Sequence, residues 1–151
     1  PDSVNFRPSR ITPKPFVQGP QTAVVVGPAG EEIYTDKYGR IKVQFHWDRE
    51  GKKDENSSCW LRCMQTTGVR GWGSRFIPRI GQEVVVPFRK GNPDRPPVSG
   101  LVYNADQKPA YELPAEKTKS YIKTNSSKGG EGYNELRFGV WAPRIDGGGQ
   151  R

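Results

Sequence analysis

The stretch RIKVQFHW (residues 40–47) alternates between apolar and polar side chains along its whole length. This two-residue period is the strongest strand signal in the chain and predicts a β-strand with one buried and one solvated face. The alternation separates two sets of side chains: Ile41, Val43, Phe45 and Trp47 on one face, and Lys42, Gln44 and His46 on the other.

Four further segments on either side of this stretch predict short strands: residues 22–26, 59–65, 83–88 and 98–103. Residues 22–26 and 83–88 contain runs of valine and are followed by turn-forming Gly and Pro. In residues 59–65, alternation puts Trp60, Arg62 and Met64 on one side and Leu61 and Cys63 on the other. Residues 76–81 predict a bend, because Pro78 cannot donate to a ladder. Five short strands within about 85 residues predict an all-β domain over residues 21–104, a five-stranded Greek-key barrel of the OB-fold type. A closed barrel would also remove exposed strand edges.

The segments outside residues 21–104 carry weaker signals. Residues 1–20 contain five prolines and predict an extended linker, and residues 105–120 predict a second linker. Two brief β-like patches, residues 121–124 and 135–138, are too short to form a domain alone. Residues 139–151 contain three consecutive glycines and predict a disordered tail.

Composition excludes several classes of protein. The chain has 151 residues, with 24 Lys and Arg against 16 Asp and Glu, so its formal net charge is +8. No apolar run approaches the ~18 residues of a membrane span. The first residues lack Met and an apolar signal core, which predicts a piece of a longer protein without a signal peptide.

The two cysteines do not predict a disulfide or a metal site. If Cys59 and Cys63 share a strand, their Cα atoms lie about 13 Å apart, beyond the reach of a disulfide. With a single histidine, His46, a Cys/His zinc site lacks ligands. We expect two buried or half-buried free thiols, no metal and no cofactor.

The residues do not favour catalysis. His46 would have to serve any Ser-His or Cys-His site, yet it lies on the solvated face of a regular strand. The carboxylates of residues 48–55 share one loop with three basic residues, which is typical of mixed surface charge. We therefore expect no enzymatic activity and no catalytic residues.

Charge and aromatic content leave a binding module open. Between Arg62 and Arg95 the chain has seven basic residues and two acidic ones, with aromatic residues among them. A basic-aromatic face at Trp72, Arg75 and Arg79 would suit single-stranded nucleic acid or an acidic glycan. Alternatively, Trp60 fills the core, and the arginines coat the surface or pair with neighbouring subunits.

Several runs of the sequence resemble the VgrG family, the spike proteins of bacterial type VI secretion systems, which are related to phage tail-spike and baseplate hub proteins. The resemblance covers residues 6–138 in one collinear register. The runs that carry it are YTDKYGRIKVQFHWD (34–48), WLR (60–62), FIPRIGQEVVV (76–86), GNPDRPP (91–97), SKGG (127–130) and NELRF (134–138).

The resemblance implies an order of domains. Residues 1–20 would link a missing hub domain to the OB-fold barrel of residues 21–104. After the linker of residues 105–120, residues 121–138 would begin a trimeric β-helical needle. After Phe138 the sequence departs from the acidic, polar repeats usual in the family.

The resemblance also implies a mechanical function. The family's homotrimer caps a tube of hexameric rings, carries a tip protein, and is driven through a target envelope to deliver effectors. Assembly would take place in the bacterial cytoplasm, followed by secretion into the medium or a target cell. Nucleic acid is then not an expected partner.

Four apolar residues of the terminal patches are candidates for contacts in a shared needle core: Tyr121, Ile122, Leu136 and Phe138. Packing back against the barrel wall is the alternative. Because the needle supplies most of the shared burial in the family, we expect this chain alone to be a monomer at micromolar concentration.

Overall fold

The computed structural model describes residues 5–139, which form two compact units. The first unit contains the chain up to Ala29 and residues Ile33–Val102, and the second contains Gly30–Glu32 and the chain from Tyr103 onward. The disordered tail that we expected over residues 139–151 lies outside the described residues, except for Gly139. All regular elements of the described chain are strands, apart from one 3-10 turn, so the expectation of an all-β chain is confirmed.

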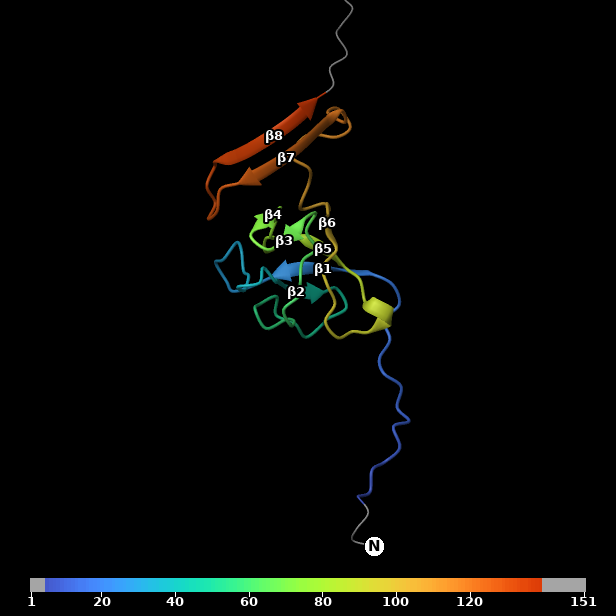
Figure 1. Cartoon of the computed structure of the whole chain (residues 1–151). Coiled ribbons are helices and arrows are strands. Elements are labelled where there is room, and N and C mark those ends of the chain that lie inside the picture. The colour runs from blue at the N-terminus through green and yellow to red at the C-terminus, as the bar shows by residue number, and fades with distance from the viewer. Residues whose placement is uncertain (1–4, 140–151) are drawn as a thin grey trace, which may run out of the picture. The chain divides into compact units, whose positions relative to one another are not determined.

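The first unit is built on a four-stranded antiparallel sheet with the order β2-β1-β5-β6 (Figure 1). Its strands are β1 (Gln21–Val26), β2 (Lys42–Phe45), β5 (Glu83–Val86) and β6 (Gly100–Val102). β1 is central: Val25 lies opposite Val43 of β2, and Ala23 lies opposite Val84 of β5. A small hairpin of β3 (Gly68–Val69) and β4 (Trp72–Gly73) and a 3-10 turn, η1 (Arg89–Gly91), complete the unit.

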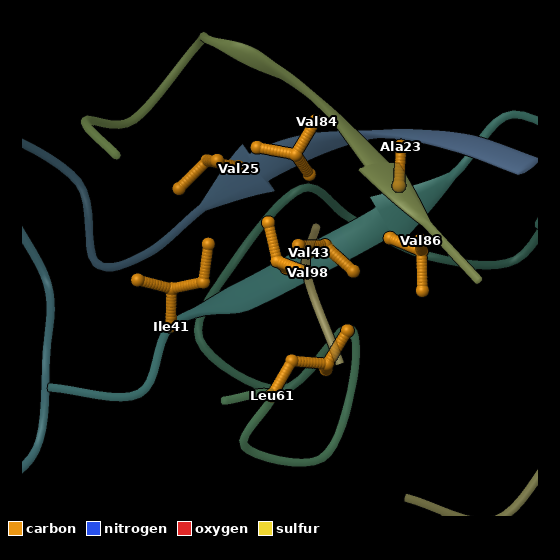
Figure 2. Packing of buried hydrophobic residues seen from close by; sticks show 8 residues of the cluster. All are labelled: Ala23, Val25, Ile41, Val43, Leu61, Val84, Val86 and Val98. Atoms are coloured by element: carbon orange, nitrogen blue, oxygen red, sulfur yellow. The ribbon is translucent and has the colours of Figure 1, made fainter. Parts of the chain in front are cut away.

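One face of this sheet forms the hydrophobic core, because alternate β-branched residues point to the same side. Figure 2 shows the strand residues and the loop residues that close the cluster. Its buried members are Ala23, Val25, Ile41, Val43, Leu61, Val84, Val86 and Val98.

The prediction of a strand over residues 59–65 is wrong. The predicted five-stranded barrel is not closed in the described part of the chain, because the sheet has four strands and two free edges. Backbone hydrogen bonds join Leu61 to Ile41 in both directions, at 2.9 and 2.8 Å, but Met64 N donates instead to Val98 O. The segment therefore changes partner after one antiparallel bridge and forms a single parallel bridge at Cys63. Leu61 and Cys63 occupy the inner side of the segment, since Leu61 is buried and Cys63 packs against the core. The sheet stays open because this segment crosses the core without forming a ladder.

The strand over residues 40–47 is shorter than expected. β2 ends at Phe45 and a turn follows, so Trp47 leaves the apolar face and is 62% exposed. Its ring stacks on Phe45, with centroids 5.1 Å apart, and its indole N–H donates to Gln21 Oε1 at 2.6 Å.

Gln44, which we placed on the solvated face, is buried. Its amide holds the charged loop after β2: Oε1 accepts from Lys53 N at 2.7 Å, and Nε2 donates to the carbonyls of Asp48 and Gly51. The loop of residues 48–57 therefore covers this side of the strand, which local alternation does not predict.

The second unit is an antiparallel hairpin of β7 (Lys119–Asn125) and β8 (Tyr133–Gly139). Both expected β patches are present, and each is longer than its sequence signal. The unit contains two strands and no β-helix within the described residues.

Candidate functional site

The β7–β8 hairpin has two chemically different faces, set by its register. Ile122 lies directly opposite Leu136, and Ser120 lies opposite Phe138. Because alternate residues share a face, Ile122, Leu136 and Phe138 all point to one side of the hairpin. They are 52%, 55% and 60% exposed. We call these three residues the apolar face.

The opposite face carries Tyr121, which the sequence analysis grouped with the other three residues. Its hydroxyl accepts a hydrogen bond from Ala110 N at 2.9 Å and lies 3.4 Å from the hydroxyl of Tyr103. The hydrogen bond between the two tyrosine hydroxyls is the main reason that the pKa of Tyr103 is raised. The structure therefore separates Tyr121 from the other three residues and gives it partners within its own unit.

Tyr111, from the segment before β7, covers this second face, a role the sequence analysis missed. Its ring meets that of Tyr121 edge-on, with centroids 5.0 Å apart, and its hydroxyl donates to the Glu135 carboxylate. Arg137 Nη1 donates to the same hydroxyl at 3.1 Å, and this bond is the first cause of the raised pKa of Arg137. One face of the hairpin thus has an aromatic and ionic cover from its own chain.

The expected basic-aromatic face lies on and after the β3–β4 hairpin. Trp72 is 69% exposed and Arg75 is exposed, whereas Arg79 is half-buried at the bend that contains Pro78. The backbone N–H of Arg79 donates to Gln82 Oε1 at 2.7 Å. The side chains of Trp72 and Arg75 are thus exposed, whereas Arg79 is partly buried in the bend and does not share their exposed surface to the same extent.

Trp60 does not fill the core, so that part of the alternative is wrong. It is half-buried on the outer side of its segment, where its ring lies 5.0 Å from Tyr34 and 5.1 Å from the Lys42 ammonium. The alternation in residues 59–65 requires this, because Leu61 and Cys63 occupy the inner side.

The one histidine of the chain lies at the surface, beside a carboxylate. The side chain of His46 is 57% exposed, and its Nε2 lies 3.6 Å from Glu83 Oε1. Within residues 5–139, no group of three His, Cys, Asp or Glu side chains is placed to hold a metal ion. No helix of this described part is long and apolar enough to cross a membrane.

Both cysteines are free thiols in different environments. Cys59 is exposed, whereas Cys63 is half-buried against the core. Burial raises the pKa of the Cys63 thiol to about 11.

Comparison of the sequence with known proteins identifies an OB domain over the residues that form most of the first unit. The family described as "Type VI secretion system/phage-baseplate injector OB domain" matches residues 21–103. The type VI secretion system spike proteins VgrG1b and VgrG1c of Pseudomonas aeruginosa are each 60% identical to the chain over 135 residues, which is 88% of it. VgrG1a of the same organism is 59% identical over 138 residues, or 90% of the chain. The chain spans only 18%, 19% and 22% of these three relatives.

Proposed function

Since this chain belongs to the family of type VI secretion system/phage-baseplate injector OB domains, we propose that it is a structural part of a type VI secretion spike. The observation that carries the proposal is its 60% identity to a spike protein over 135 residues. The open four-stranded sheet would form the OB domain of the spike, and the β7–β8 hairpin would lead into the needle.

The apolar face provides the contacts for assembly in this proposal. An isolated two-stranded hairpin is marginally stable in water, and the other face already has its cover from Tyr111. Three copies would bring Ile122, Leu136 and Phe138 together, and burying each side chain contributes roughly 1–2 kcal/mol. The full-length protein is then a homotrimer whose shared core begins at this hairpin.

The function proposed for the whole spike is mechanical. The trimer caps the tube of hexameric rings, carries a tip protein and effectors, and punctures a target envelope without catalysing a reaction. It is assembled in the cytoplasm and secreted by the apparatus. The contribution of this chain is the rigid β-structure that transmits force to the needle.

A chimera tests this proposal. Residues 6–138 would replace the matching segment of VgrG1b, and secretion of the chimera into the medium would be measured against unmodified VgrG1b. We expect secretion close to that of VgrG1b. A folded chimera that stays in the cell would contradict the proposal.

The apolar face is tested in the same chimera with Ile122→Asp/Leu136→Asp. Each trimer would then bury six carboxylates without partners, so trimer formation and secretion should both be lost. Val69→Asp is the matched control, because Val69 is also half-exposed but lies in β3. Equal secretion of the double variant and the control would exclude a shared core at this face.

A second candidate is a binding module for single-stranded nucleic acid or an acidic glycan. The exposed side chains of Trp72 and Arg75 favour it, because binding sites for single strands combine aromatic rings, on which bases stack, with cations. A salt-dependent mobility shift of single-stranded DNA that Arg75→Ala weakens would support it. A shift that this substitution leaves unchanged would count against it.

A further inference from the structure

The loop between β5 and β6 holds a concentration of positive charge that the spike proposal does not use. It lines a surface hollow together with one residue of the segment after Trp60. The lining residues are Arg62, Arg89, Lys90, Asn92, Asp94 and Arg95. We call this the basic hollow.

The cations of the basic hollow lack internal partners. Arg62, Arg89, Lys90 and Arg95 are all exposed, and within the described chain none of them forms an ion pair with a carboxylate. Four positive charges against the single carboxylate of Asp94 leave a local excess. Repulsion among the cations disfavours their gathering unless a negative group joins them.

The backbone fixes this loop before any partner arrives. Lys90 and Gly91 take left-handed conformations, with φ of 52° and 70°, and Arg95 has φ of 59°. Gly91 is buried beneath the Phe16 ring, where a Cβ atom would lie 2.1 Å from a ring carbon, and Gly91 O accepts from Val17 N at 2.9 Å. A fixed loop reduces the entropy that binding must overcome.

We propose that the basic hollow is a docking site for an acidic segment of a partner protein, recognised through its Asp and Glu carboxylates. Arginine guanidinium groups bind carboxylates through two parallel hydrogen bonds, and three of the four cations are arginines.

The lining favours a peptide over nucleic acid. It contains no aromatic ring on which a base would stack, whereas stacking supplies much of the affinity for single strands. It also contains Asp94, which repels a phosphodiester backbone. A peptide offers carboxylates for the cations and N–H donors for Asp94. This inference does not depend on the spike proposal.

A binding experiment with the whole chain tests the proposal. The probes are a fluorescent Glu-Gly repeat peptide and a fluorescent oligothymidylate of equal formal charge, followed by anisotropy over a salt series. We expect the peptide to bind more tightly. Tighter binding of the oligothymidylate would overturn the proposal, as would no peptide binding at low salt.

Substitutions locate the bound peptide. Arg62→Gln/Arg89→Gln/Arg95→Gln should weaken peptide binding about tenfold, because three exposed pairs contribute modestly each. The matched control, Arg7→Gln/Arg10→Gln/Lys14→Gln, removes the same charge from exposed residues before β1 and should change affinity less than about twofold. Equal losses in the two variants would mean general charge attraction and would overturn the site.

Alkylation of a cysteine beside the basic hollow tests the proposal on the unmodified chain, so the result does not depend on the folding of any variant. Exposed Cys59 lines an adjoining hollow with Asn92, Asp94 and Arg95. Saturating peptide should therefore slow alkylation of Cys59 several-fold. An unchanged rate at saturation would place the peptide elsewhere and would overturn the proposal.

Discussion

The carboxylate of Glu32 accepts a hydrogen bond from the backbone N–H of Lys128, 96 residues further along the chain, with Oε2 and N 2.7 Å apart. Its other oxygen accepts from Gly129 N at 2.5 Å. Lys128 and Gly129 both have positive φ, of 56° and 69°, so their successive N–H groups converge on one anion. The conformation of the loop between β7 and β8 is thus matched to a carboxylate from a distant segment.

This relationship predicts local protection from hydrogen exchange. Glu32→Ala should accelerate exchange at the amides of Lys128 and Gly129 by roughly tenfold, because their acceptor is removed. Glu31→Ala, at the neighbouring position, is the control and should leave both rates unchanged. Identical rates in the two variants would show that Glu32 does not hold the loop in solution.

Burial of Leu61 should dominate the stability of the segment that replaces the expected strand. Leu61 is 1% exposed, so Leu61→Ala should lower the free energy of unfolding by about 3 kcal/mol through lost burial and a cavity. Met64, in the same segment, is 67% exposed, and Met64→Ala should cost less than about 0.5 kcal/mol. Urea denaturation measures both, and similar losses would contradict this packing.

The Asp36–Arg40 pair predicts a loss of stability in acid. Desolvation raises the pKa of the Asp36 carboxyl, but hydrogen bonds from the Arg40 side chain and from the N–H groups of Arg40 and Tyr38 outweigh it, so the pKa is lowered. The Arg40 Nη2 atom lies 2.6 Å from Asp36 Oδ2. A lowered pKa in the folded state stabilises the fold above the unfolded pKa of about 3.9, and this contribution is lost as pH falls below it.

Asp36→Asn tests this linkage, since Asn keeps an acceptor for the two backbone N–H groups but removes the charge. The wild-type chain should have the higher urea midpoint at pH 7, and the difference between the two proteins should shrink as pH falls below about 4. A difference that is independent of pH would exclude a contribution from the charge.

The two thiols should differ in reactivity, because the thiolate is the reacting form. Cys63 has a pKa of about 11 and is half-buried, whereas Cys59 is exposed. At pH 8 a thiol reagent should label one cysteine rapidly per folded chain, and Cys59→Ser should abolish this phase. Cys63→Ser should retain it, and rapid labelling of both thiols in the folded chain would contradict the burial of Cys63.

Local sequence patterns predicted the strands that form regular ladders. Residues 22–26 and 83–88 have runs of valine that fit buried strands, and both appear as expected, in β1 and β5. The alternation in residues 59–65 correctly placed Leu61 and Cys63 on one side and Trp60 on the other, but it did not decide which side faces the core. It failed to predict the hydrogen bonding, because a segment that changes partner between Ile41 and Val98 has the same period as one that follows a single neighbour.

The candidate site was predicted only in part for a similar reason. Apolar residues in the two terminal patches indicated contacts in a core shared between chains, but this grouping ignored that Tyr121 and Ile122, as neighbours in one strand, point to opposite faces. The register decides only the cross-strand partners, in which Ile122 lies opposite Leu136 and Tyr121 lies opposite Arg137. Tyr111 gave no signal at all, since its role depends on a contact with Glu135, 24 residues away.

The sequence by itself determined the β class, the strand periods and the family, because these depend on residue types at short and regular spacing. Only the tertiary structure decided the burial of Gln44 beneath its charged loop, the open sheet and the covering of one face of the hairpin by Tyr111. Each of these depends on which distant segment supplies the next hydrogen bond or covering side chain, and short-range spacing carries no information about that choice.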